Sequence, residues 1–130
     1  MFPRRQKCPF TKYGVLKEEH EQAAVVAFLR EKYPDALFTI APNGMKLPPS
    51  VAIRLSRTGY RAGTPDIMIF EPRGRFHGLF VEMKATRGGE VSKPQVIFRE
   101  ALLARGYQSI ICAGAGAARL CITEYMEATK

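Results

Sequence analysis

Apolar residues recur along this chain with two spacings, and the changes from one spacing to the other predict eight secondary-structure elements. Apolar positions three or four residues apart indicate helices, and short continuous apolar runs bounded by glycine or proline indicate buried strands. The expected order is helix, strand, short helix, strand, strand, helix, strand, helix, over residues 18–32, 36–41, 50–58, 67–70, 78–84, 92–106, 107–113 and 117–127. This order predicts an α/β fold in which helices flank a mixed β-sheet.

Glycine and proline mark the boundaries between these elements. Tyr33-Pro34 ends the first helix, Pro42-Asn43-Gly44 forms a turn, and Gly59 suits the left-handed position after the short helix. Residues 71–77 are enough for a hairpin connection between two strands. A glycine-rich turn is expected before the last helix, which should start near Ala117.

The length of 130 residues fits one domain with a core of its own. We expect residues 16–130 to form this domain, and residues 1–15, which are basic and contain proline, to form a mobile arm. No apolar run is long enough to span a membrane, and no apolar stretch near the N-terminus indicates a signal peptide. The three cysteines lack CxxC spacing, which favours free thiols in the cytoplasm.

The chain is basic, with a formal net charge of +8, and the charge is unevenly distributed. The stretch between Ala36 and Pro65 contains no acid and four basic residues, Lys46, Arg54, Arg57 and Arg61. Such a block favours a polyanionic partner. The alternative is a solvated surface that serves solubility alone.

Two acids occupy positions that could hold a metal ion. Asp66 follows Pro65 and leads into a strand, and Glu82 lies late in the next strand, two residues before Lys84. Because strand side chains alternate, Glu82 and Lys84 share one face while Met83 points to the other. Carboxylates from adjacent strands can hold a hard divalent cation, and the ammonium can orient a water molecule. A plain Glu82–Lys84 surface pair is the alternative, but the acid upstream favours a site.

Other catalytic classes find little support in the sequence. Neither the two histidines nor the cysteines have zinc-ligand spacing. No serine lies in a G-x-S-x-G context, and no P-loop is present, so a serine hydrolase and an ATP-dependent enzyme are not indicated.

The succession Gly63-Thr64-Pro65-Asp66, then Glu82-Met83-Lys84, then Gln95 resembles the PD-(D/E)XK nuclease superfamily. More narrowly, it is similar to the virus-type replication-repair nuclease (VRR-NUC) domains of phages and DNA-repair enzymes. The resemblance extends from Glu18 to the C-terminus. It implies a restriction-endonuclease-like core and a location in the cytoplasm of a bacterium or a phage-infected cell.

The expected activity is hydrolysis of DNA phosphodiester bonds with Mg²⁺ or Mn²⁺. Asp66, Glu82 and the main-chain carbonyl of Met83 are the expected ligands, and Lys84 would orient the attacking water. Stand-alone members of the family resemble junction-resolving nucleases, so a structure-selective homodimer is expected. The alternatives are a basic protein that binds nucleic acid without cutting it, and a nonspecific nickase or flap nuclease of the same fold.

The family also carries a glutamate on its first helix, for which Glu18, Glu19 and Glu21 are candidates. At about 100° per residue, Glu18 lies in the middle of the apolar stripe that contains Val25 and Leu29. Glu21 lies on the other flank of this stripe. We expect Glu18 to complete the metal site, with Glu21 as the alternative. A purely structural explanation is that Glu18 is an acid in the first turn of the helix, where the helix dipole favours a negative charge.

Gln95 has two interpretations. Ser92-x-x-Gln95 is a capping-box pattern, in which the glutamine closes the start of a helix. The family resemblance assigns a glutamine at this place to the active site. The sequence does not choose between them.

Several basic residues are available for contacts with DNA phosphates, which supply affinity without base recognition. They are Arg54, Arg57, Arg61, Arg73, Arg75, Arg87 and Lys93. No base-reading module is evident, which favours recognition of DNA structure over sequence.

Overall fold

The computed structural model describes residues 17–43, 47–85 and 89–128. The expected N-terminal arm lies outside these residues. Within them the chain forms eight elements in the predicted order: α1 (Lys17–Lys32), β1 (Phe38–Ile40), α2 (Pro49–Arg57), β2 (Ile67–Ile69), β3 (Leu79–Lys84), α3 (Lys93–Ala104), β4 (Gln108–Ala113) and α4 (Gly114–Met126). None of these helices combines the length and apolarity that crossing a membrane requires.

The four strands form one mixed sheet in the order β1-β2-β3-β4. The β1–β2 and β2–β3 pairs are antiparallel, and β3 pairs with β4 in parallel. The predicted hairpin joins β2 to β3, and its turn is closed by two hydrogen bonds between the main chains of Arg73 and Phe76, of 3.1 and 2.9 Å. The parallel pair needs a crossover, which α3 provides. The predicted mixed sheet is therefore confirmed.

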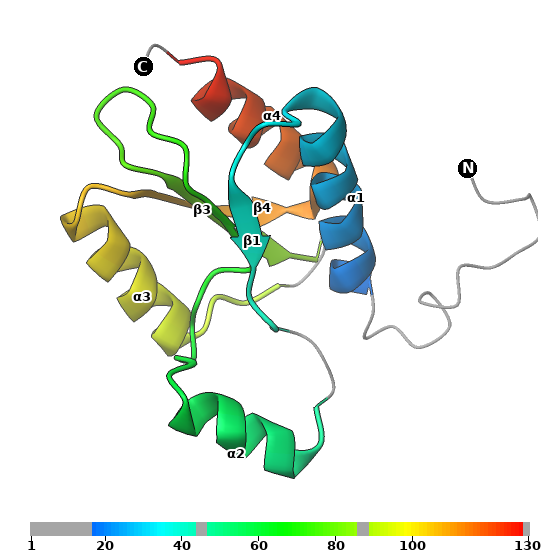
Figure 1. The fold of residues 1–130 in the computed structure, drawn as a ribbon, viewed down its shortest axis with the longest axis vertical. Coiled ribbons are helices and arrows are strands. Elements are labelled where there is room, and N and C mark those ends of the chain that lie inside the picture. The colour runs from blue at the N-terminus through cyan, green and yellow to red at the C-terminus, as the bar shows by residue number, and fades with distance from the viewer. Residues whose placement is uncertain (1–16, 44–46, 86–88, 129–130) are drawn as a thin grey trace, which may run out of the picture.

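Side-chain alternation divides the sheet into an apolar face and a face that carries the polar residues of β3. The apolar face packs against α1 and α4, which lie side by side, whereas α3 covers the other face (Figure 1). The centre of the core consists of fully buried residues from four elements, Val25, Leu29, Ile67, Ile69, Val81 and Ile122. Phe80, Glu82 and Lys84 belong to the α3 face, so β3 presents its charged residues beside the start of α3.

The start of the last helix differs from the prediction. No separate turn precedes it, because β4 ends at Ala113 and α4 begins at Gly114. Gly114 has a φ of +87°, a conformation that glycine adopts without steric cost. One left-handed residue thus redirects the chain from strand to helix, so the expected glycine-rich turn belongs to the first turn of α4.

Helix α2 stands apart from the two layers. It projects away from the sheet (Figure 1) and buries none of its residues. Proline lies in its first turn, where a missing N–H costs nothing, and Arg54 and Arg57 lie in its last turn. Both chain segments that join α2 to the fold lead toward the start of β2.

Candidate active site

Asp66 and Glu82 meet at one end of the β2–β3 pair. Ile67 pairs with Val81 in this antiparallel ladder, and one further step places Asp66 opposite Glu82. Directly opposed residues share a face of the sheet, with Cβ atoms about 5 Å apart. Both are buried, with 7% and 6% of their surfaces exposed. Two adjacent buried carboxylates are costly unless hydrogen bonds or a cation compensate them, which marks this place as a site.

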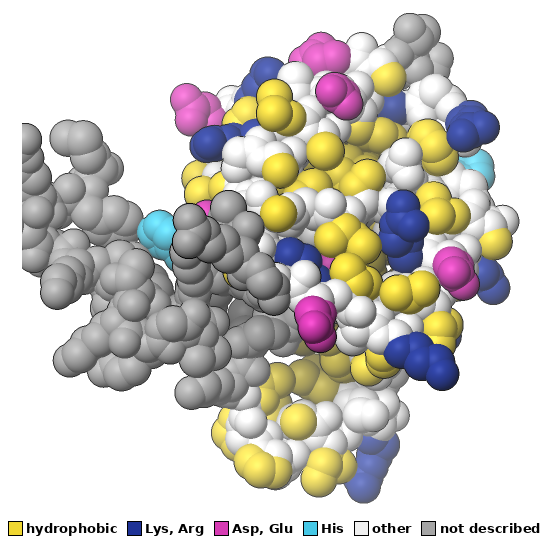
Figure 2. Space-filling view, turned by 180° about the vertical axis from the view of Figure 1, so that it is seen from behind, with side chains coloured by type: hydrophobic (Ala, Val, Ile, Leu, Met, Phe, Trp, Pro, Cys, Tyr) yellow, Lys and Arg dark blue, Asp and Glu magenta, His cyan; other side chains and the backbone are white. Residues whose placement is uncertain are grey.

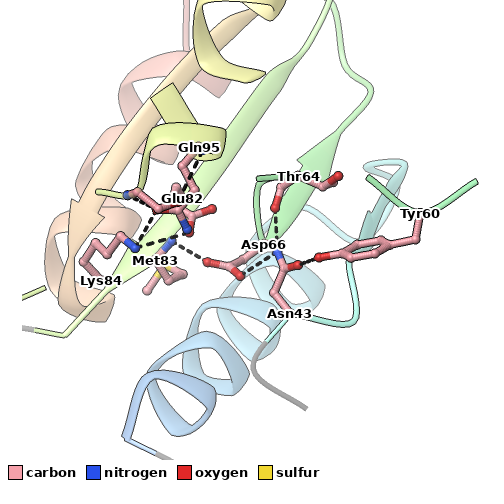
Figure 3. A network of polar contacts seen from close by, with 9 residues as sticks. Asn43, Tyr60, Thr64, Asp66, Glu82, Met83, Lys84 and Gln95 are labelled. Atoms are coloured by element: carbon pink, nitrogen blue, oxygen red, sulfur yellow. Dashed lines mark hydrogen bonds and ion pairs between the residues drawn. The ribbon is translucent and has the colours of Figure 1, made fainter. Parts of the chain in front are cut away.

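Both oxygens of the Asp66 carboxylate accept hydrogen bonds (Figure 3). The main-chain N–H of Met83 donates to Oδ2 at 2.7 Å, and the Asn43 side-chain amide donates to Oδ1 at 3.0 Å. The Asp66 carbonyl accepts from Ala41 N–H at 3.0 Å, which extends the β1–β2 ladder by one residue. The acid is thereby held from both neighbouring strands.

Glu82, Lys84 and Gln95 form a second group of contacts beside Asp66. The Lys84 ammonium lies 3.7 Å from Glu82 Oε1 and donates to Gln95 Oε1 at 2.9 Å. Gln95 Nε2 donates to Glu82 Oε1 at 2.5 Å. One glutamine side chain therefore links the acid and the base of the same strand, as Figure 3 shows.

Gln95 caps α3 and also contacts Glu82 and Lys84. The predicted capping box is present: Ser92 N–H donates to Gln95 Oε1 at 2.9 Å, and Gln95 N–H donates to Ser92 Oγ at 3.4 Å. The oxygen that closes the helix start is the one that accepts from Lys84. Closing α3 and holding Lys84 are thus one arrangement, which the sequence patterns treated as alternatives.

The Gly-Thr-Pro-Asp loop also packs against the start of α3. Gly63 has a φ of +91°, and a Cβ at this position would lie 2.3 Å from the carbonyl oxygen of Pro94. A glycine is therefore required for both the conformation and the close approach. This contact sets the distance between the loop that carries Asp66 and the helix that carries Gln95.

The structure describes the side chain of Glu21 but not that of Glu18, the other candidate glutamate of α1. The Glu21 carboxylate accepts a hydrogen bond from the main-chain N–H of Ala115, in the first turn of α4. This contact caps a helix that has no side-chain cap of its own, where a negative charge is favoured by the helix dipole. Glu18 lies in the first turn of α1, but its side chain is outside the described part of the chain, so the metal role of Glu18 stays a prediction.

Comparison with known proteins identifies the family. The family model described as VRR-NUC domain matches residues 16–116. The chain belongs to the VRR-NUC family. The resemblance inferred from its motifs is therefore confirmed, and with it a nuclease-type fold.

A solved structure supports the same fold. The chain is similar to one described as a VRR_NUC domain protein, with 23% sequence identity and a TM-score of 0.76 over 88% of this chain and 92% of that one. At this identity the likeness shows the fold alone. No match is found among curated proteins.

The donor atoms of this VRR-NUC site fit a hard divalent cation. Asp66 and Glu82 offer carboxylate oxygens, which Mg²⁺ and Mn²⁺ prefer. Because a strand residue directs its N–H and C=O toward the same neighbour, the Met83 carbonyl faces the side on which Asp66 lies. Among the side chains that the structure describes, no third acid, histidine or cysteine joins the pair.

The basic residues predicted to bind phosphates are divided between two ends of the VRR-NUC domain. Arg54, Arg57, Arg61 and Lys93 are exposed on α2, on the segment after it and at the start of α3. The Arg61 guanidinium lies 5.5 Å from the centre of the Phe98 ring of α3. These four residues belong to the segments that lead into the site.

Arg73 and Arg75 lie elsewhere, in the β2–β3 hairpin at the opposite end of the strands from Asp66. The Arg73 side chain donates from Nε to the Met126 carbonyl at 2.9 Å, so it fastens the hairpin to the end of α4. The structure therefore does not bring these two arginines to the site. Arg87 lies outside the described residues.

Asn43 and Tyr60 belong to the contacts around Asp66, although no sequence motif marks them. The sequence predicts only that Asn43 lies in a turn. The Tyr60 hydroxyl donates to Asn43 Oδ1. Burial raises the pKa of this hydroxyl above its ordinary value, and the charges of Asp66 and Glu82 raise it further, so it remains a donor at neutral pH. Nothing in the local sequence distinguishes Asn43 from an ordinary turn asparagine.

Arg99 was also missed, although its spacing offered a signal. It follows Gln95 by four residues and therefore lies on the same side of α3. Its Nε donates to the Ser109 carbonyl of β4 at 3.0 Å, and its side chain lines a small recess together with Glu82. Helix α3 is thus attached to β3 through Gln95 and to β4 through Arg99.

Proposed function

We propose that this chain is a divalent-metal-dependent DNA endonuclease. The observation that carries the proposal is the placement of buried Asp66 opposite buried Glu82, with the Lys84 ammonium 3.7 Å from Glu82. Membership of a nuclease-type family supports it. Two carboxylates on the ends of adjacent strands can hold a divalent cation, and a neighbouring lysine can orient a water, which together suit metal-assisted hydrolysis of a phosphodiester.

Asp66, Glu82 and the carbonyl of Met83 would hold Mg²⁺ or Mn²⁺, and Glu18 would complete this set. When bound there, the ion would polarise a phosphoryl oxygen and stabilise the charge that develops during attack. The strand pair supplies rigid positions for three of these ligands, because Glu82 and Met83 lie in β3 and Asp66 immediately precedes β2.

Lys84 would orient the attacking water and favour its deprotonation near the scissile phosphate. Gln95 supports this role, since its side chain contacts both Lys84 and Glu82. Its second task, the capping of α3, limits its own freedom to move. We therefore assign Gln95 to the active site as the group that holds Lys84 in place.

The substrate that we propose is branched DNA. Arg54 and Arg57 carry positive charge on the projecting helix α2, whose lobe bears basic side chains along one edge (Figure 2). Such residues contact phosphates, which are common to all DNA sequences, so the shape of the substrate would decide binding. Symmetric incision of a junction needs two active sites, and one chain offers one candidate site, which supports a homodimer. Light scattering on the purified protein tests this assembly.

A panel of DNA substrates tests the proposed activity. The protein is incubated with four-way junction, flap, nicked and linear DNA in the presence of Mg²⁺, Mn²⁺ or EDTA. We expect products from the junction with either metal, and none with EDTA. Shifted but uncut DNA under all conditions would indicate a non-catalytic binder. Products restricted to flap or nicked DNA would indicate the other nuclease activities.

The salt dependence of DNA binding tests the role of α2. We expect the double variant Arg54→Gln/Arg57→Gln to bind DNA more weakly, and the slope of log K against log salt to fall by about 2, because each phosphate contact contributes about one. Fluorescence anisotropy with labelled junction DNA in EDTA measures both quantities.

A charge-matched control separates contact from net charge. Arg30 and Arg119 are exposed on α1 and α4, the helices on the opposite side of the sheet from α3. Arg30→Gln/Arg119→Gln removes the same charge and should leave the slope unchanged. Equal losses in both double variants would show that α2 is not the DNA-binding surface.

A further inference from the structure

A chain of side-chain contacts leads from Asp66 away from the strands (Figure 3). Asn43 donates to Asp66 Oδ1 at 3.0 Å, and the Tyr60 hydroxyl donates to the oxygen of the Asn43 amide. Asn43 precedes α2 in the chain and Tyr60 follows it. The two residues thus approach Asp66 from both segments that connect α2 to the fold.

The Asn43 amide is held in one orientation by its partners. Its nitrogen donates both to Asp66 and to the Thr64 carbonyl, the latter at 2.5 Å. Its oxygen accepts from Tyr60. Rotation of the amide by 180° would set its oxygen against two groups that only accept, the Asp66 carboxylate and the Thr64 carbonyl. These two acceptors therefore fix which end of Asn43 faces the carboxylate, and the Tyr60 hydroxyl holds the opposite end of the amide.

We propose that Asn43 is a positioning residue that orients Asp66 for metal binding, and that Tyr60 holds Asn43 in place. Asn43 and the Met83 N–H contact different oxygens of the carboxylate. Rotation of this carboxylate about its Cβ–Cγ bond would break one contact or both. This inference rests on the proposed function, because it names the residues that prepare one ligand of the proposed metal.

A hydrogen bond from Asn43 is compatible with metal binding by Asp66. A carboxylate offers about four lone-pair directions, so one oxygen can accept a hydrogen bond and also bind a cation. Partners of metal-ligating carboxylates commonly contribute about 10- to 100-fold to metal affinity or activity. The contribution comes from a carboxylate that is already oriented when the cation arrives.

Mn²⁺ binding without DNA tests the proposal independently of cleavage. Electron paramagnetic resonance of free Mn²⁺ gives the dissociation constant for the wild type, Asn43→Ala and Tyr60→Phe. We expect Asn43→Ala to weaken Mn²⁺ binding about 10-fold, and Tyr60→Phe to weaken it less. In cleavage assays the Mn²⁺ concentration for half-maximal rate should rise likewise, while DNA affinity in EDTA remains unchanged.

Tyr125→Phe is the matched control. The Tyr125 hydroxyl also donates a part-buried hydrogen bond, to the Glu71 carbonyl at 2.6 Å, but at the far end of the sheet. This variant should lose some thermal stability and keep the wild-type Mn²⁺ affinity. If Tyr60→Phe acted only through stability, the two tyrosine variants would have the same Mn²⁺ affinity.

The outcomes separate this inference from the proposed function. Wild-type Mn²⁺ affinity in both Asn43→Ala and Tyr60→Phe would overturn the positioning role and leave the metal-dependent nuclease intact. Absence of Mn²⁺ binding by the wild type would overturn both. If Asn43→Ala fails to fold, Tyr60→Phe decides, because it removes a single oxygen atom.

Discussion

Replacement of Lys84 by alanine should abolish DNA cleavage while the protein stays folded. Among the described residues, the Lys84 ammonium is the cationic group that contacts both Glu82 and Gln95. The Lys84 side chain is 13% exposed, which leaves the ammonium accessible to a water at the site. Removal of a group that positions and activates the nucleophile lowers rates by about 10²- to 10⁴-fold. Cleavage of junction DNA under single-turnover conditions measures this loss.

Lys93→Ala is the control for the loss of one positive charge near the start of α3. Lys93 is exposed and its substitution should weaken DNA binding slightly, with the cleavage rate at saturating protein unchanged. Circular dichroism and thermal unfolding should show that both variants are folded. Full activity of Lys84→Ala would exclude the assigned role of the lysine.

Substitution of Asp66 by asparagine should remove cleavage and also destabilise the fold. Both oxygens of Asp66 accept from donors, the Met83 N–H and the Asn43 amide. An asparagine must direct its own NH₂ group at one of these donors, which leaves a buried group without an acceptor. We expect the free energy of unfolding to fall by about 1–3 kcal/mol, measured by urea denaturation in EDTA so that metal binding does not contribute.

The same variant should lose Mn²⁺ affinity, because an amide oxygen is a weaker ligand than a carboxylate for a hard cation. Asp35→Asn removes an acid that is exposed in the loop after α1, and it should change neither Mn²⁺ affinity nor stability. If Asp66→Asn binds Mn²⁺ and cleaves DNA like the wild type, Asp66 is not a metal ligand.

Local pattern was sufficient for the central residues. Glu82 and Lys84 share a face because strand side chains alternate, and Asp66 faces them because one hairpin joins their strands. Both relations act over short distances in the sequence. Apolar spacing likewise predicted the order of the elements and the mixed sheet, since each strand had to bury one face or both.

Strand direction decided which basic residues could belong to the site. Arg73 and Arg75 are close in sequence to Asp66 and Glu82, and the sequence grouped them with the other basic residues. The hairpin that carries them lies at the opposite end of β2 and β3, and Arg73 is held by the end of α4. Each strand residue advances the chain by about 3.3 Å, so a few residues of strand separate the hairpin arginines from Asp66 and Glu82 in space.

By itself, the sequence determined the fold class, the family and the pair of carboxylates with its lysine, because these depend on periodicity and on neighbours joined by a short hairpin. Only the tertiary structure showed that Glu21 caps α4 and that the Gln95 side chain that caps α3 also contacts Lys84. The same holds for the contacts of Asn43 with Asp66 and of Tyr60 with Asn43. The reason is physical: these contacts connect segments far apart in the chain, and a single polar side chain in a turn or a helix carries no periodic signal that names its partner.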